Sequence, residues 1–448
     1  MIICATVCTV QAQSASDSLY LSPADLPDAG TFLPAPPDWT SKAFTDDFYQ
    51  WQWGNSMRDS NRGQQASDDS RYGTEQMASL FSNILGITIS EENSPAIYRL
   101  ISKGGDTGAL STDSVKAFYS RKRPFVMMKG HTWGQYDNEE QLRDNGSFPS
   151  KHAALSWSTA LILAEMTPNL QDNILKGGYD YGDSRIITGA NWQSDVDAAR
   201  LSAAATVARM HCNPDFTADL MAAQAEYRQL INDNDSVVVQ MPQGQTFLPV
   251  AVDTVSTRYY GDVIRLWLMK PERNTDRGVQ AVADADYSDS ALLATFAPAL
   301  GIDLAIDSVP ALSQLLSSAK FIFITSANEL RNTKFRKRPF VQLADPTLIP
   351  GEEEAHALLS SYPSVGAQIG WGLALLLTEV APQQQNDILT RGYEFGRSRI
   401  IAGFNFPSDV QAGRILATAV VARLHTNPIF KMLIQAAIDE YATLFQLP

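Results

Sequence analysis

Long stretches of the chain carry apolar residues at helical spacing. Residues 151–166 read KHAALSWSTALILAEM, with no Gly or Pro to interrupt a helix, and 198–211 form a similar Ala-rich run. No series of alternating apolar and polar positions, as strands show, stands out. The short stretch FIFIT (321–325) is compatible with a strand but lies in helical surroundings. We therefore expect an all-α fold.

Helix start signals support this expectation. Ser150 stands directly before the run 151–166 and suits an N-cap. Ser194 and Asp197 match the spacing of a capping box, in which the first residue is the N-cap. Ser408 and Gln411 match the glutamine variant of the same box. The sequence thus predicts helices that begin after Ser150, Ser194 and Ser408.

The same pattern is present twice in the chain. SRIITGANWQSDVDAAR at 184–200 recurs as SRIIAGFNFPSDVQAGR at 398–414, and RKRPF and TFLP also recur. We interpret the chain as a tandem duplication with domains at 16–235 and 236–448. The join lies near 232–242, where Asn, Asp, Pro and Gly residues end the last helix of the first copy. We expect two similar helical domains that pack together, and leave a homo-oligomer open.

Composition and charge narrow the class of protein. The hydrophobic fraction of 44% and charged fraction of 19% suit a globular chain with a sizeable core. The formal net charge of −14 argues against nucleic acid as a partner, because phosphate backbones require a basic surface. It leaves small anions open, since a local group of cations can bind them. No stretch reaches the length of uninterrupted apolar residues that a membrane span needs.

The N-terminus contains a short apolar run at 2–10, followed by a small-residue site resembling a cleavage signal. A basic segment, which signal peptides usually have, does not precede it. We interpret 1–15 as a signal peptide and expect a periplasmic or secreted protein, with an ordinary N-terminal segment as the alternative. Two of the three cysteines lie in this segment, so the mature chain would keep only Cys212 and form no internal disulfide.

The first copy contains cations, a helix N-terminus, an imidazole and a carboxylate in a fixed order. These groups are Lys116, Arg123, the segment PSKH at 149–152, Arg185, Asn191 and Asp195. Arginine binds phosphate oxygens through a planar fork, and lysine supplies a point charge. Backbone N–H groups at the start of a helix also point at an anion. The set predicts a phosphate pocket.

This order resembles the signature of the class A bacterial non-specific acid phosphatases of the PAP2 (phosphatidic acid phosphatase type 2) superfamily. That signature is K-x6-R-P, then P-S-G-H, then S-R-x5-H-x3-D. The segments GTFLP, RKRPF and SDVDAAR are also similar to the family, so the resemblance covers both copies almost end to end. It implies phosphate or small phosphomonoesters as ligands. No group of His and Cys residues has metal-ligand spacing, and we expect neither a metal nor a cofactor.

The resemblance implies a role for each matching residue of the first copy. His152 would be the general acid, and Asp195 would orient the nucleophile. The phosphate oxygens would be held by Lys116, Arg123, Ser150, the backbone N–H of Lys151, which replaces the family's Gly, and Arg185. The nucleophile position holds Asn191, where the family has His. A carboxamide nitrogen has its lone pair delocalised into the carbonyl, so it does not readily attack phosphorus.

The second copy departs further from the family pattern. Its general-acid position is Gly366, and its nucleophile position is again Asn. The degenerate second site consists of Arg331, Arg338, Ser364, Arg399, Asn405 and Asp409. Structural retention and anion binding are both compatible with these residues.

Three functions remain open from the sequence. We expect a phosphate or phosphomonoester site in the first copy with weak or no hydrolysis, because the nucleophile is missing. The first alternative is an active secreted acid phosphatase in which water attacks directly and His152 is the acid. The second is a purely structural or interaction protein. Whether the chain is an enzyme stays undecided at this point.

Overall fold

The computed structural model describes residues 19–232, 240–305 and 308–446. Within these ranges the chain forms helices and connecting loops and contains no strand, which confirms the all-α expectation. The stretch 321–325, compatible with a strand by its sequence, lies inside helix α17 (Pro310–Thr333). The segment 1–15 and most of the join at 232–242 lie outside the described residues. In the described part, no helix has the length and apolar composition needed to cross a membrane.

The N-terminal half contains short helices around longer ones. They are α1 (Ala29–Phe32), α2 (Phe44–Met57), α3 (Asn61–Asp68), α4 (Thr74–Leu85), α5 (Pro95–Leu110), α6 (Asp113–Tyr119), α7 (Pro124–Met127), α8 (Glu139–Asp144), α9 (Lys151–Met166), η2 (Pro168–Leu170), α10 (Gln171–Thr188), α11 (Gln193–Met210) and α12 (Pro214–Leu230).

The C-terminal half follows a similar order. Its helices are α13 (Gly244–Phe247), α14 (Thr257–Met269), η3 (Lys270–Asn274), α15 (Asp276–Ala283), α16 (Asp289–Leu300), α17, α18 (Pro339–Leu343), η4 (Pro350–Glu352), α19 (Glu353–His356), α20 (Val365–Val380), η5 (Pro382–Gln384), α21 (Gln385–Ile401), α22 (Pro407–Leu424) and α23 (Pro428–Phe445).

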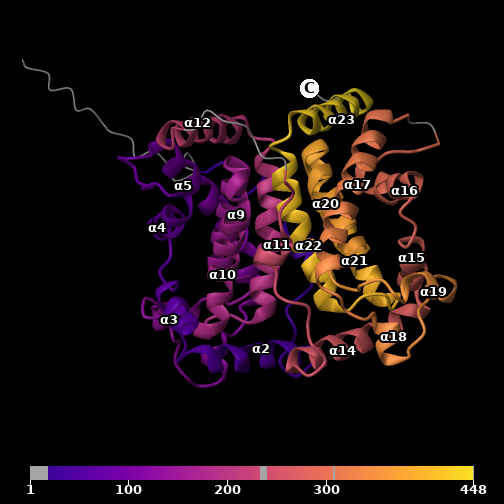
Figure 1. Cartoon of the computed structure of the whole chain (residues 1–448), viewed down its shortest axis with the longest axis horizontal. Helices are drawn as coiled ribbons and strands as arrows, with labels where there is room; N and C mark the ends of the chain where they lie inside the picture. Colours follow the sequence, from indigo (N-terminus) through magenta and orange to yellow (C-terminus); the bar gives the residue numbers. More distant parts are fainter. Residues whose placement is uncertain (1–18, 233–239, 306–307, 447–448) are drawn as a thin grey trace, which may run out of the picture.

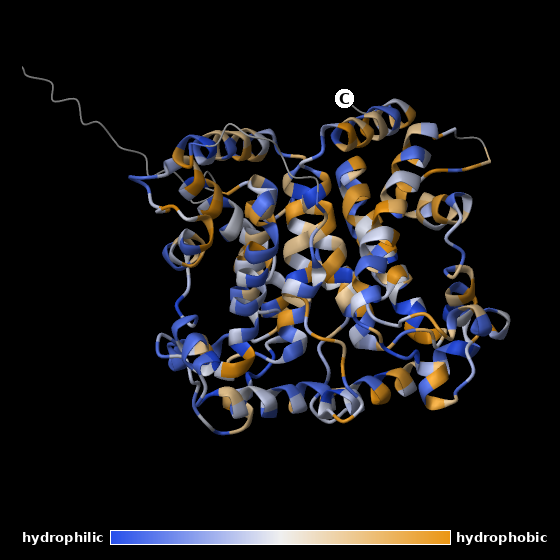
Figure 2. Ribbon diagram, in the orientation of Figure 1, coloured by the Kyte–Doolittle hydropathy of each residue, from blue (hydrophilic) through white to orange (hydrophobic). Residues whose placement is uncertain are grey.

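Helices α9 and α20 form the centre of the two halves. All residues of α20 are buried, as are those of α9 from Ala153 to Met166. A helix that is apolar on all sides requires a complete shell of neighbours. Helix α9 is surrounded by α5, α10 and α11, and α20 by α17, α21 and α22. Figure 1 shows the two groups side by side, and Figure 2 shows their inner helices as the more apolar part of the molecule.

The two halves interlock along their shared boundary. Helix α11 contacts α20 and α22, and α22 also contacts α9. Each half in addition places an aromatic residue from its TFLP segment against a tryptophan of the other half. Phe32 lies 5.9 Å from Trp371 between ring centroids, and Phe247 lies 6.5 Å from Trp157. Because both tryptophans are fully buried, each half depends on the other to complete its core.

The helix caps agree with the sequence at one position and differ at two. Ser150 caps α9, accepting the N–H of Ala153, as predicted. Helices α11 and α22 begin earlier than predicted, after Trp192 and Phe406, so the assignment of Ser194 and Ser408 as N-caps is wrong.

The earlier starts have a common physical cause. The carboxylates of Asp195 and Asp409 accept the backbone N–H groups of Trp192 and Phe406, at 2.7 Å and 2.9 Å. The hydroxyls of Ser194 and Ser408 are engaged elsewhere, since they donate to buried aspartates of α2 and α14.

Two histidines meet at the boundary between the halves. His211 and His425 follow the last turns of α11 and α22, and their rings stack with 3.8 Å between centroids. His211 lies 3.1 Å from the carboxylate of Glu165, and His425 lies 2.9 Å from that of Glu379. Burial alone would lower the pKa of His425, but Glu379 and Glu165 raise it to about 9. His425 is therefore an imidazolium at neutral pH.

This contact predicts that stability falls in alkaline solution. The pKa of His425 is higher in the folded chain than its ordinary value of 6.5, so its stabilisation is complete below about pH 6.5 and is lost as the pH rises through 9. The loss is at most about 3 kcal/mol. Urea unfolding between pH 6 and 10 should show this fall in the wild type and a smaller fall in Glu379→Gln. Glu354→Gln, at an exposed position, should behave as the wild type. Equal slopes in all three proteins would contradict the prediction.

Candidate functional site

Lys116 and Arg123 converge on the loop that precedes α9. The ammonium of Lys116 donates to the carbonyls of Gly146, at 2.9 Å, and Pro149, at 2.6 Å. Arg123 donates to several carbonyls of the same loop and, through Nη1, to the carbonyl of Ala190 at 2.9 Å. The two cations thus join the ends of α6 and α10 to the start of α9.

Burial and neighbouring arginines lower the pKa values of both cations. Burial, with a further effect of Arg123, lowers the pKa of Lys116 to about 7. Burial, followed by Arg185, lowers the pKa of Arg123 to about 10. Cations that repel one another in this way are stabilised by an anion placed among them.

Asn191 is buried and is bound to the loop. Its Nδ2 donates to the carbonyl of Ser147 at 2.7 Å, and its side chain is 2% exposed. In the C-terminal half, Nδ2 of Asn405 donates to the carbonyl of Ser361 at 2.6 Å. Asn191 therefore ties the loop before α11 to the loop before α9, and Asn405 ties the loop before α22 to the loop before α20. In the N-terminal half the amide nitrogen thus acts as a hydrogen-bond donor, while Oδ1 of Asn191 accepts from Nη1 of Arg123 at 3.5 Å.

Asp195 is committed to other partners than residue 191. It accepts from Arg121 at 2.6 Å and from the backbone N–H of Trp192. Arg121 also binds Asp47 of α2 at 2.7 Å. None of the hydrogen bonds in the described part of the chain joins Asp195 to Asn191. Sequence reasoning did not assign Arg121 to the site, although the repeated RKRPF segment gives a signal for it.

The residues at the start of α9 point in different directions. Ser150 caps the helix, and the ammonium of Lys151 pairs with Asp113 at 2.9 Å near the surface. The ammonium of Lys151 is thus engaged with Asp113. His152 lies between the rings of Tyr72 and Tyr181, with Nε2 3.2 Å from the carbonyl oxygen of Ser70. Sequence reasoning missed both tyrosines, because no motif includes them.

The electrostatic surroundings of His152 keep its imidazole neutral. Burial first, and then Arg185, lower its pKa well below 6.5. A general acid must carry the proton that it donates. An anion bound among the cations would offset their charge and raise the pKa of His152, so that its acid form depends on an occupied site.

Arg185, at the end of α10, is fully buried and already has a partner. Its Nη2 lies 2.8 Å from Oδ1 of Asp137, while Nε and Nη1 have no hydrogen-bond partner among the described residues. Asp137 lies in the loop before α8. It occupies no motif position, so the sequence contained no signal for this contact.

The C-terminal site retains its arginines and replaces the acid. Arg338 donates to the carbonyl of Phe404 at 2.9 Å, and Arg331 donates to that of Pro363 at 3.2 Å. Burial, followed by the neighbouring arginines, lowers the pKa of Arg338 to about 9. A Cβ atom on Gly366 would lie 2.3 Å from the hydroxyl of Tyr287, so this tyrosine fills the place of the missing side chain.

The other C-terminal candidates repeat some contacts of the N-terminal half and replace others. Ser364 caps α20 and donates to Oδ1 of Asn405 at 3.2 Å. Asp409 accepts from Arg336 at 2.5 Å, as Asp195 does from Arg121. Arg399 packs over the ring of Phe404, at 4.5 Å from its centroid. The two halves thus share their backbone contacts but differ in charged partners.

A cavity of about 470 Å³ lies elsewhere, at the boundary between the halves. Asp46 and Asp197 from the N-terminal half and Arg265 and Arg414 from the C-terminal half contribute to its lining. Its lining includes none of the candidate site residues of either half, so volume alone does not identify the site.

Comparison with known proteins identifies a family and several relatives. The PAP2 superfamily model matches residues 100–217, which include every candidate residue of the N-terminal half. A non-specific acid phosphatase of Providencia stuartii is 40% identical over 215 residues, which is 48% of this chain and 86% of that protein. One of Salmonella typhimurium is 33% identical over 220 residues, covering 49% and 86%. An acid phosphatase of Zymomonas mobilis subsp. mobilis is 36% identical over 168 residues, covering 38% and 64%.

Removal of Arg121 should destabilise the N-terminal half strongly. Without it, the buried carboxylates of Asp47 and Asp195 would lose their counter-charge, which typically costs about 3–5 kcal/mol. Urea unfolding of Arg121→Gln should show a loss of this order, whereas the exposed neighbour Lys122→Gln should leave stability almost unchanged. Similar values for the two variants would show that the ion pairs do not support the site.

Proposed function

The chain belongs to the non-specific acid phosphatases of the PAP2 superfamily, and on that premise we propose that its N-terminal half binds phosphate or a small phosphomonoester. We further propose that hydrolysis there is weak or absent. One observation carries this proposal: at the nucleophile position, Asn191 donates its amide to the carbonyl of Ser147. A group used in this way offers no lone pair to phosphorus.

Binding of the anion rests on the buried donors. Burial lowers the pKa of Lys116 and of Arg123, with further effects of Arg123 on Lys116 and of Arg185 on Arg123. Arg185 has two donor atoms without partners among the described residues. The N–H groups at the start of α9, after Ser150, add the positive end of a helix dipole. A tetrahedral oxyanion accepts hydrogen bonds from all of these groups at once.

Catalysis lacks one of its two chemical groups. His152 would donate a proton to the leaving oxygen, and a bound phosphate would supply the negative charge that keeps this imidazole protonated. Direct attack by water, with His152 as the acid, is the second candidate function. Direct attack by water requires no covalent intermediate at position 191.

The organisation of the chain is part of the proposal. A tandem duplication, with domains at 16–235 and 236–448, accounts for the matching contacts of Asn191 and Asn405 and for the exchanged aromatic residues at the boundary. The C-terminal domain completes the core of the first and holds a site without a general acid. A periplasmic or secreted location, based on the apolar run at 2–10, goes with this function.

Restoration of the nucleophile tests the proposal directly. Asn191→His should hydrolyse p-nitrophenyl phosphate at least about a hundredfold faster than the wild type, because the general acid His152 then acts on a covalent pathway. Quenching with an alkaline denaturant after brief mixing should trap a phosphorylated protein, because phosphohistidine is stable in base and labile in acid. Asn405→His is the matched control and should gain nothing, since Gly366 offers no acid. An equal gain in both variants, or a fast wild type, would contradict the proposal.

Anion affinity should fall as the pH rises through about 7, where Lys116 loses its proton. Sulfate is the suitable probe because its charge stays constant over this range. Titration calorimetry between pH 6 and 9 should show the decline in the wild type and a shallower decline in Lys116→Met, at lower affinity throughout. Lys151→Met should follow the wild type, because its ammonium pairs with Asp113. A flat wild-type profile would remove Lys116 from the site.

A further inference from the structure

Asp137 places a carboxylate on the arginine that the proposed function assigns to an anion. The two side chains form an ion pair of 2.8 Å, and Arg185 and Asp137 are 0% and 2% exposed. Water does not screen a pair at this depth, so the attraction is much stronger than in a surface ion pair. A phosphate that approaches Arg185 therefore meets a negative charge already bound there.

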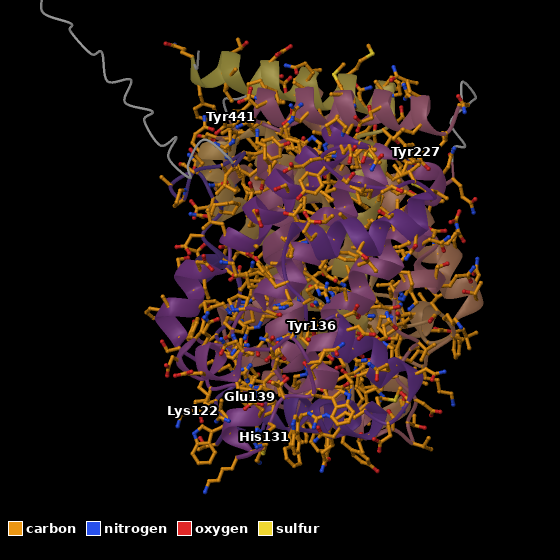
Figure 3. The ribbon with its side chains drawn as sticks, turned by 90° about the vertical axis from the view of Figure 1, so that its left-hand side faces the viewer. Lys122, His131, Tyr136, Glu139, Tyr227 and Tyr441 are labelled. Atoms are coloured by element: carbon orange, nitrogen blue, oxygen red, sulfur yellow. The ribbon has the colours of Figure 1, made fainter. Side chains whose placement is uncertain are left out.

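The loop around Asp137 holds this carboxylate in position. The hydroxyl of Thr132 donates to Oδ2 of Asp137 at 2.6 Å, and the N–H of Trp133 donates to the carbonyl of Thr188 at 2.9 Å. Glu139 accepts the N–H of Thr132 at 2.9 Å. Figure 3 shows Glu139 beside His131 near one end of the N-terminal half. The carboxylate is thus a fixed part of the site and not a side chain that meets Arg185 by chance.

The C-terminal half has the same loop without the carboxylate. Leu348 N–H donates to the carbonyl of Ala402 at 3.0 Å, as Trp133 does to Thr188, and Thr347 binds Glu353 as Thr132 binds Glu139. Arg399 is 4% exposed, and its side chain makes no hydrogen bond or ion pair within the described residues, with Nη1 buried without a partner. The loop therefore folds without a carboxylate on the arginine.

We propose that Asp137 is an internal competitor for the anion in the N-terminal site. Its carboxylate occupies the donor of Arg185 that an incoming oxyanion needs, lowers the affinity of the site for phosphate and sulfate, and disfavours doubly charged ligands most. This inference rests on the proposed function, since it concerns the same site. Asp137 determines which anions the site accepts and takes no part in bond breaking.

The test compares sulfate and phosphate binding in full-length chains that all carry Arg399→Ala, so that the C-terminal arginine does not contribute. Asp137→Asn keeps the shape of the side chain and removes its charge. Calorimetry should show at least about tenfold tighter sulfate binding than in the parent, the order of one hydrogen bond to a charged group. Asp144→Asn, which removes an exposed carboxylate near the same loop, should leave the affinity unchanged.

Further variants separate the possible outcomes. Thr132→Val keeps the charge of Asp137 but removes the hydrogen bond that holds its carboxylate. It should give a smaller gain in sulfate affinity, and it provides the test if Asp137→Asn folds poorly. Equal binding in the parent and Asp137→Asn, lost in both on Arg185→Ala, would overturn the competitor and leave the phosphate site standing. Absence of sulfate and phosphate binding in every variant would overturn the proposed function together with this inference.

Discussion

A buried arginine between two aspartates fixes the geometry of each half. Arg121 binds Asp47 of α2 and Asp195 of α11, and Arg336 binds Asp262 and Asp409 in the same way. Burial of such charges is costly unless the ions and their hydrogen bonds are complete. Here each carboxylate also accepts backbone N–H groups at the start of α11 or α22. The network therefore sets where these helices begin, and with them the loops that carry Asn191 and Asn405.

The sequence predicted the parts of this arrangement that depend on local pattern. The apolar run after Ser150 predicted α9 and its cap, because a 3.6-residue period and an N-cap residue are properties of neighbouring positions. The predicted starts of α11 and α22 were wrong because the hydroxyls of Ser194 and Ser408 donate to aspartates that are distant in the sequence. Asp137 and Tyr287 could not be predicted, since they reach the sites from loops whose course depends on tertiary packing.

Comparison of the two halves distinguishes residues with a structural role from residues that set the charge of each site. Asn191 and Asn405 make the same bond to a loop carbonyl, although the chemical groups around them differ. The amide is thus explained by its structural role in both places. The charged partners differ instead: Arg185 is paired and Arg399 is not. The motif of arginine, asparagine and aspartate at fixed spacing therefore accounts for the shared backbone contacts. The surrounding loop determines which charged groups lie next to the arginine.

Lys116 and Arg331 occupy matching positions but differ in how readily they release a proton. A buried lysine can release its proton, and the pKa of Lys116 of about 7 means that half of its charge is already lost near neutral pH. Arginine retains its proton far more strongly, because burial lowers the pKa of Arg331 only to about 10. The N-terminal site thus reduces its own positive charge through Lys116 and Asp137. The C-terminal site has neither means, and the carboxylate of Asp409 is the acidic group that acts on Arg331 and Arg338 there.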